Sequence, residues 1–236
     1  MAVLRCHHLP VFGLGFSWLC AALSEAAQRL IQALLQGASP RFNSEIVIDT
    51  HLKESLISGE VVYDGVFLKV RRDLVRLPDG KETAREYFRH PGAVVIIPVL
   101  EDGSVLLERQ FRYPPDQVFV EFPAGKLEFG EDSLHCAQRE LREETGYSAS
   151  DWQFVCTIHN AIAYSDEHLD LYLARGLTSG TQQLDEGEFL DVFSLPFDEL
   201  MHWIRLGKIT DVKTLIGAFW LDKIRRGEWD PAARDR

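Results

Sequence analysis

The stretch AGKLEFGEDSLHCAQRELREETGY, residues 124–147, constrains the fold more than any other part of the chain. Asp132 and Ser133 are of residue types that start helices, and Gly146 is of the type that ends them. Between them, apolar residues recur at helical spacing, as Leu134, Ala137 and Leu141. This pattern predicts one helix from about residue 133 to residue 145, entered from a loop and followed by a turn.

Three glutamates crowd the end of this predicted helix: Glu140, Glu143 and Glu144. Because residues three and four apart share a helix face, we expect them to project together, on the side opposite Ala137 and Leu141. Like charges at that spacing destabilise a helix, and acidic groups near its C-terminus oppose its dipole. A hard divalent cation with oxygen ligands would remove that cost. An ordinary solvated face of Arg and Glu is the alternative interpretation.

The longer spacing favours the cation. Seven identities keep fixed positions along the stretch: Gly125, Glu131, Arg139, Glu140, Glu143, Glu144 and Gly146. At roughly one in fifteen for each position, they would coincide by chance about once in 10⁸ starting points. In this spacing the stretch resembles the Nudix box, the loop–helix–loop signature of Nudix hydrolases, with Tyr147 as a soft departure. That family hydrolyses nucleoside diphosphates linked to another moiety, using Mg²⁺ or Mn²⁺.

The resemblance implies roles for individual residues. Glu140 and Glu144 would be metal ligands, and the Ala124 carbonyl would complete their site. Glu143 would be a further ligand or a base, oriented by Arg139.

Three more positions would have structural roles. Glu131 would brace the loop against the helix, and Gly125 and Gly146 would frame the site. A diphosphate repels a nucleophile by its own charge, and bound cations both neutralise that charge and acidify a bound water.

The segment RQFRYPPDQVFVEFPAGKLEFGE around the start of the box resembles the ADP-ribose pyrophosphatase branch of the family. Arg109 and Arg112 are its candidate phosphate contacts, because an arginine fork suits phosphate oxygens. Being three apart, they face opposite ways on a regular strand, and we favour Arg112. Either arginine could instead pair with surface carboxylates. Glu121 is either a buried partner of the site or a plain strand residue.

The later segment DEGEFLDVFSLPFDEL resembles a loop of the same branch that carries a catalytic glutamate. Glu188 is the candidate and Glu186 the alternative, although an ordinary acidic turn would explain both. The implied reaction is hydrolysis of ADP-ribose to AMP and ribose 5-phosphate. Ile162 stands where the branch tends to show a proline, so GDP-mannose or another nucleotide sugar stays open as substrate. A non-catalytic Nudix-fold sensor is the alternative of another class, but such relatives lose box glutamates.

The whole pattern predicts an α/β (α+β) protein: a Nudix α/β/α sandwich with a mixed sheet, preceded by a small antiparallel sheet. We divide the chain into an extension (1–42), an antiparallel β subdomain (43–90) and a Nudix domain (91–228). The extension is either poorly ordered or contains one amphipathic helix, and its apolar start also permits a signal peptide.

Individual elements follow from hydrophobic periodicity. The subdomain has strands in 45–52, 60–77 and 83–90, with a turn at Pro78-Asp79-Gly80. Residues 92–100 and 104–113 form a predicted hairpin across Asp102-Gly103, and 117–125 is another strand. Strands at 152–162, 168–177 and 188–196 and helices at 197–207 and 211–227, the last capped by Asp211, complete the chain.

Composition limits the partners. A net charge of −11 argues against a nucleic-acid surface, and no stretch suits a membrane span. The four cysteines are scattered, which predicts neither a zinc site nor disulfides and favours the cytoplasm. In the resembling branch the first sheet builds a homodimer. Its aromatic residues are therefore candidates for interface or stacking roles, although core packing is favoured for each of them: Tyr63, Phe67, Tyr87 and Phe88.

Overall fold

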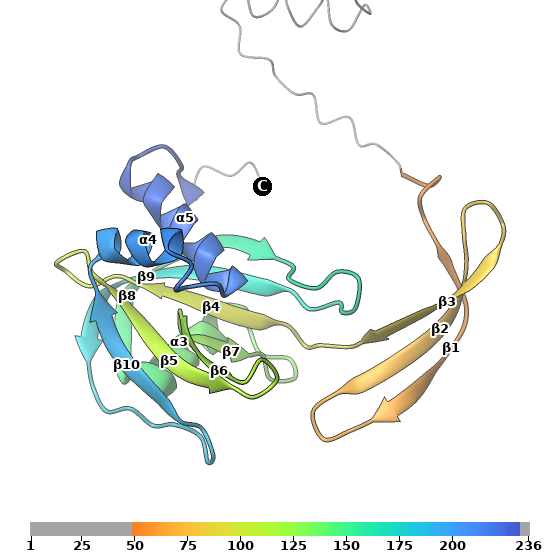
Figure 1. Ribbon diagram of the computed structural model, residues 1–236, viewed down its shortest axis with the longest axis horizontal. Coiled ribbons are helices and arrows are strands. Elements are labelled where there is room, and N and C mark those ends of the chain that lie inside the picture. The colour runs from red at the N-terminus through yellow and green to blue at the C-terminus, as the bar shows by residue number, and fades with distance from the viewer. Residues whose placement is uncertain (1–48, 232–236) are drawn as a thin grey trace, which may run out of the picture. The chain divides into compact units, whose positions relative to one another are not determined.

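A computed structural model describes residues 49–231 of the chain (Figure 1). The predicted N-terminal extension and its helix lie outside the described residues, as does most of the strand predicted at 45–52. Residues 50–52 form a turn, so the strand prediction is wrong there.

The first sheet is small and antiparallel, in the order β1-β2-β3, with β1 Ser55–Asp64, β2 Lys69–Arg76 and β3 Glu82–Phe88. Its β2–β3 turn contains Gly80 at φ 86°, as the Pro-Asp-Gly signal predicts. Every residue of β1 is exposed. The core role favoured for Tyr63 and Phe67 is wrong, because they are 59% and 71% exposed.

Two further sheets build the main domain. One is mixed, in the order β7-β4-β9-β8, with β4 Ala93–Pro98, β7 Ala124–Lys126, β8 Tyr147–Ile158 and β9 Leu169–Ser179. Strand β4 runs parallel to β9 and antiparallel to β7. The other sheet is antiparallel, in the order β10-β5-β6, with β5 Val105–Arg112, β6 Gln117–Glu121 and β10 Leu190–Leu195.

The predicted turn at Asp102-Gly103 forms, with Gly103 at φ 83° and the Leu100 N–H donating to the Ser104 carbonyl at 2.9 Å. The predicted hairpin between 92–100 and 104–113 is otherwise wrong: beyond the isolated bridge from Val99 to Val105, β5 pairs with β6 and β10. Both edges of β4 are taken by β7 and β9, which are distant in sequence and could not be read from the local turn signal.

Helices cover both faces of the β4 sheet (Figure 1). Helix α3 (Ser133–Thr145) lies on one face, with α4 (Phe197–Arg205) and α5 (Val212–Arg225) on the other. Strand β4 is buried on both sides: Val94 and Ile96 belong to the α3 cluster, and Val95 and Ile97 to the α4–α5 cluster. Burying each such side chain contributes about 1.5–3 kcal/mol, which explains the continuous apolar run. This is the predicted α/β/α sandwich.

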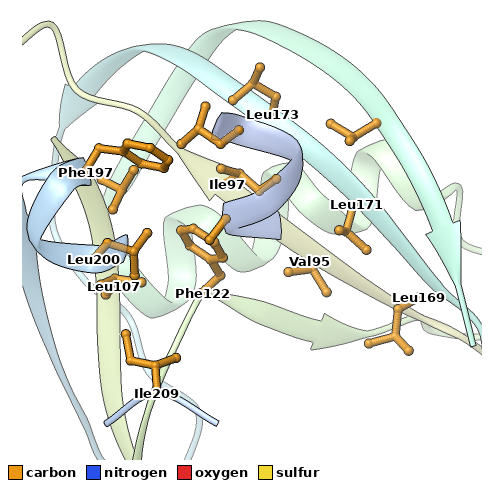
Figure 2. Packing of buried hydrophobic residues seen from close by; sticks show 14 of the residues in the cluster. Val95, Ile97, Leu107, Phe122, Leu169, Leu171, Leu173, Phe197, Leu200 and Ile209 are labelled. Atoms are coloured by element: carbon orange, nitrogen blue, oxygen red, sulfur yellow. The ribbon is translucent and has the colours of Figure 1, made fainter. Parts of the chain in front are cut away.

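Figure 2 shows the α4–α5 cluster, in which Phe122 lies among core residues from β4, β5 and α4. The backbone N–H of Phe122 donates to Thr214 Oγ1 at 2.9 Å. Asp211 caps α5, as predicted, by accepting from the Thr214 N–H at 3.0 Å. The end of β6 is therefore fixed to the first turn of α5. In residues 49–231, no helix combines the length and apolarity needed to cross a membrane.

Candidate active site

Helix α3 has the predicted limits, and both ends are fixed by specific bonds. The Asp132 carboxylate accepts from the backbone N–H groups of Leu134 and His135 at 3.0 and 3.2 Å. Gly146 ends the helix in the left-handed region at φ 75°, and its N–H donates to the Arg142 carbonyl at 2.9 Å. The loops on either side of α3 are thereby held in place.

Arg139 links three of the predicted glutamates. Its Nε and Nη2 donate to the two carboxylate oxygens of Glu131, each at 3.0 Å. Its Nη1 donates to Glu140 Oε1 at 2.8 Å and to Glu143 Oε2 at 3.0 Å. The bidentate bond from Arg139 holds the pKa of Glu131 at about 2. Because Glu131 also accepts from the Glu128 N–H at 3.0 Å, it joins the loop before α3 to the helix.

Gly125 lies directly against Glu140. A Cβ at position 125 would fall 1.8 Å from Glu140 Cδ, so only glycine leaves room for that carboxylate. Burial raises the pKa of Glu140, and the charge of Arg139 opposes that shift.

Glu144 is only 3% exposed, and its Oε2 accepts from the Ala124 N–H at 3.0 Å. The prediction that it lies opposite Ala137 and Leu141 is therefore wrong. Positions 137, 141 and 144 are spaced four and three apart, so they share one buried face. Burial raises the pKa of Glu144 well above its usual range, and the carboxylates of Glu108, Glu140 and Glu188 raise it further.

Glu108, on β5, was missed from the sequence. It is fully buried, and neither of its carboxyl oxygens has a hydrogen-bond partner among the described residues. Burial, followed by the charge of its cross-strand neighbour Glu121, raises its pKa to about 8. The sequence feature that could have indicated it is an acidic residue directly after three apolar residues, VLL, in a predicted strand.

Glu121 is also buried, but it is fully paired. Arg112 donates to both of its oxygens at 2.9 Å, and Lys213 Nζ donates to Oε2. Burial alone would raise the pKa of Glu121, but the bonds and charges of these two cations hold it below the usual value. Lys213, which also donates to Asp211 at 3.0 Å, was missed as well. The sequence feature that could have indicated Lys213 is its place in the first turn of a predicted helix that has an acidic cap residue.

The two candidate arginines face opposite sides of β5, because pairing with β6 runs without a bulge from Glu108 to Arg112. Arg112 points to the Glu121 side. Arg109 is exposed on the other face, beside Phe111 and Phe189 in a surface hollow of about 330 Å³.

The loop before β10 brings in Glu188. It is half-buried, and Gln110 Nε2 donates to its Oε1 at 3.4 Å. Its charge raises the pKa values of Glu108, Glu140 and Glu144, so it faces the same cluster. Glu186 is exposed.

These residues fit a hard divalent cation. When ionised, Glu108, Glu140, Glu144 and Glu188 present acceptor oxygens only, and the two oxygens of Glu108 have no hydrogen-bond partner among the described residues. Within residues 49–231, however, no three acidic, His or Cys side chains already converge as a complete metal site.

A cavity of about 280 Å³ adjoins this carboxylate cluster. Its lining includes Ala124, Gly125 and Lys126 from β7 and Asp211 and Lys213 from the start of α5. It therefore borders the backbone that contacts Glu144 on one side and a cationic side chain on the other.

Residues 89–213 match the NUDIX domain family model. The chain belongs to the Nudix family. Residues 54–88, which contain the first sheet, match the nucleoside diphosphate sugar hydrolase N-terminal domain. The chain is 38% identical over 171 residues to the methanol dehydrogenase activator of Bacillus methanolicus, covering 72% of this chain and 92% of that protein. It is 34% identical over 165 residues to the ADP-ribose pyrophosphatase of Bacillus subtilis, covering 69% of this chain and 89% of that protein.

Among solved structures, an ADP compounds hydrolase aligns with a TM-score of 0.68 at 22% identity, covering 75% of this chain and 96% of that one. This likeness supports the Nudix fold. The Nudix protein described here is a hydrolase that cleaves a pyrophosphate bond in a nucleoside diphosphate linked to another moiety. Enzymes of the family generally depend on a divalent metal.

Proposed function

We propose that this Nudix enzyme hydrolyses ADP-ribose to AMP and ribose 5-phosphate, with Mg²⁺ as its cation and Mn²⁺ as a substitute. Water adds across the P–O–P link: its oxygen joins one phosphorus, and the bridging oxygen leaves on the other as a phosphate. The relative named ADP-ribose pyrophosphatase, 34% identical over 89% of its length, supports this choice. GDP-mannose or another nucleotide sugar is the alternative substrate.

One observation carries the proposal: an excess of carboxylates stands beside a cavity with cationic side chains. Burial raises the pKa values of Glu140 and Glu144, and the charge of Glu188 raises both further. A cation at this place would offset both effects. Glu140 and Glu144, with the Ala124 carbonyl, would hold the cation. When bound, such cations neutralise the diphosphate and lower the pKa of a bound water.

The remaining residues would orient these groups. Arg139 shares Nη1 between Glu140 and Glu143, and so fixes both carboxylates on the helix. Glu143 would be a further ligand or a base, and Glu188 is the favoured base in the loop, with Glu186 as the alternative. We propose that a bound diphosphate is held by Arg112, which Glu121 positions. Arg109 is the less favoured phosphate contact, because it is exposed on the other face of β5.

The test is release of AMP from ADP-ribose by the purified full chain with Mg²⁺, followed by chromatography. Glu144→Gln should lower kcat by roughly 10³-fold, because a buried carboxylate at the cation site is neutralised. Glu101→Gln, an exposed acidic residue in a turn, is the matched control and should keep wild-type turnover. Full activity in Glu144→Gln, or turnover that persists after all divalent cations are chelated, would contradict the proposal. A panel including GDP-mannose ranks the substrates by kcat/KM.

We also propose a cytoplasmic homodimer with domains at 43–90 and 91–228. The exposed apolar side chains of β1, among them Leu56, Val61 and Tyr63, support an interface on the first sheet. Light scattering after gel filtration tests it: Val61→Asp should shift a dimer towards monomer, and a wild-type monomer would refute it.

A further inference from the structure

Glu108 is the one buried acid of the site that the proposed function leaves without a role. It is 0% exposed, and both carboxyl oxygens lack a hydrogen-bond partner in the described chain. Buried polar groups in native proteins nearly always have partners, so an orphan of this kind indicates a missing ion or water.

The neighbouring cations are already committed. Arg112 forms a bidentate bond to Glu121, and Lys213 donates to Glu121 and Asp211. Glu121 lies directly across the strand pair from Glu108, so the protein places two acids side by side and neutralises one of them. Within residues 49–231, therefore, no cation donates a hydrogen bond to Glu108, although the charges of Lys213 and Arg112 act on it from their places beside Glu121.

Glu108 faces the predicted cation ligands. Among the charges that act on Glu144, that of Glu108 is the strongest, ahead of Glu140 and Glu188. Its side chain is on the inward side of β5, the side that carries Gln110 and Arg112. Three elements, β5, α3 and the loop before β10, thus carry carboxylates whose charges act on Glu144.

We propose that Glu108 is a further carboxylate ligand for the divalent cations of this enzyme, bound directly or through one water, behind Glu144. This inference rests on the proposed cation-dependent function and extends the ligand set beyond the box. A protonated Glu108 with a purely structural role is the competing explanation. That explanation is weaker, because the O–H of a protonated acid would find no acceptor among the described residues.

Binding of Mn²⁺ to the metal-free full chain tests the inference, with free Mn²⁺ counted by electron paramagnetic resonance. Glu108→Gln keeps the side chain's size and removes its charge. Glu108→Val replaces it with a residue suited to a buried strand, so that a folded variant is available if the glutamine is not tolerated. Glu101→Gln is the exposed acidic control, Glu140→Gln is the reference for a predicted ligand, and circular dichroism verifies the fold of each variant.

We expect both Glu108 variants to lose one bound Mn²⁺, or to bind it at least about tenfold more weakly, while Glu101→Gln matches the wild type. Wild-type number and affinity in folded Glu108 variants would overturn the inference. If Glu140→Gln still weakens Mn²⁺ binding in that case, the proposed function stands and only the role of Glu108 is refuted. A wild-type chain that binds no Mn²⁺ would overturn both.

Discussion

Substituting Gly125 by alanine tests whether the position of the Glu140 carboxylate controls catalysis. Gly125 lies in strand β7, and its φ is outside the left-handed region, so its backbone accepts an alanine. The added Cβ would meet Glu140 Cδ at 1.8 Å and Oε1 at 2.0 Å. The atoms in the way belong to the flexible end of a side chain, so the glutamate moves and the strand stays.

The size of the effect follows from these distances. Ordinary carbon contacts begin near 3.4 Å, so the carboxylate must retreat by about 1.6 Å. A misplacement of about 1 Å can cost 10²-fold in rate, so we expect kcat to fall by at least about 100-fold. Stability changes little. Loss of the Arg139–Glu140 bond costs about 0.5–1.5 kcal/mol, and the lower entropy of the unfolded alanine variant offsets about 0.4–1 kcal/mol.

The assay is a double-mutant cycle on AMP release, with urea unfolding of each protein in parallel. Glu140→Ala removes the very atoms that clash, so Gly125→Ala should add less than about a threefold further loss in that background. Two results would refute the reasoning. One is a Gly125→Ala enzyme with near wild-type kcat, and the other is a pair of losses that multiply fully in the double variant.

Three further outcomes are expected. Glu188→Gln should lower kcat by about 100-fold and Glu186→Gln by less than about threefold, because the charge of half-buried Glu188 acts on Glu144 whereas Glu186 is exposed. Equal losses in the two variants would contradict the choice of Glu188 as the base. The metal-free protein should lose stability between about pH 4.5 and 8, where unfolding releases the proton that the folded state retains on Glu108 up to its pKa of about 8. The loss is at most about 4–5 kcal/mol at 1.36 kcal/mol per pH unit, and urea titrations should show a shallower pH slope in Glu108→Gln; an unchanged slope would contradict the assignment. Gly146→Ala should cost about 2 kcal/mol or more in urea unfolding, since φ is 75° and its Cβ would lie 2.8 Å from the Gln182 nitrogen; a neutral substitution would show that the turn relaxes.

Local chemistry in the sequence was sufficient for the elements that depend on neighbouring residues. The helix start at Asp132-Ser133, the helix end at Gly146 and the turn at Gly80 are set within a few positions, and each forms as predicted, with Asp132 as the cap. The box spacing likewise indicated the family, because its roles are encoded in one loop and one helix.

The elements and residues that depend on distant parts of the chain could not be read in that way. Strand β5 does not pair along β4, because β7 and β9 occupy both edges of β4. Lys213 reaches Glu121 across 92 positions, and Glu108 is an orphan only because that lysine and Arg112 are already engaged. The sequence by itself determined a helix with acidic ligands and the family that uses it. Only the tertiary structure decided which carboxylates are buried together and which lack a cation, because burial and pairing depend on packing between distant segments.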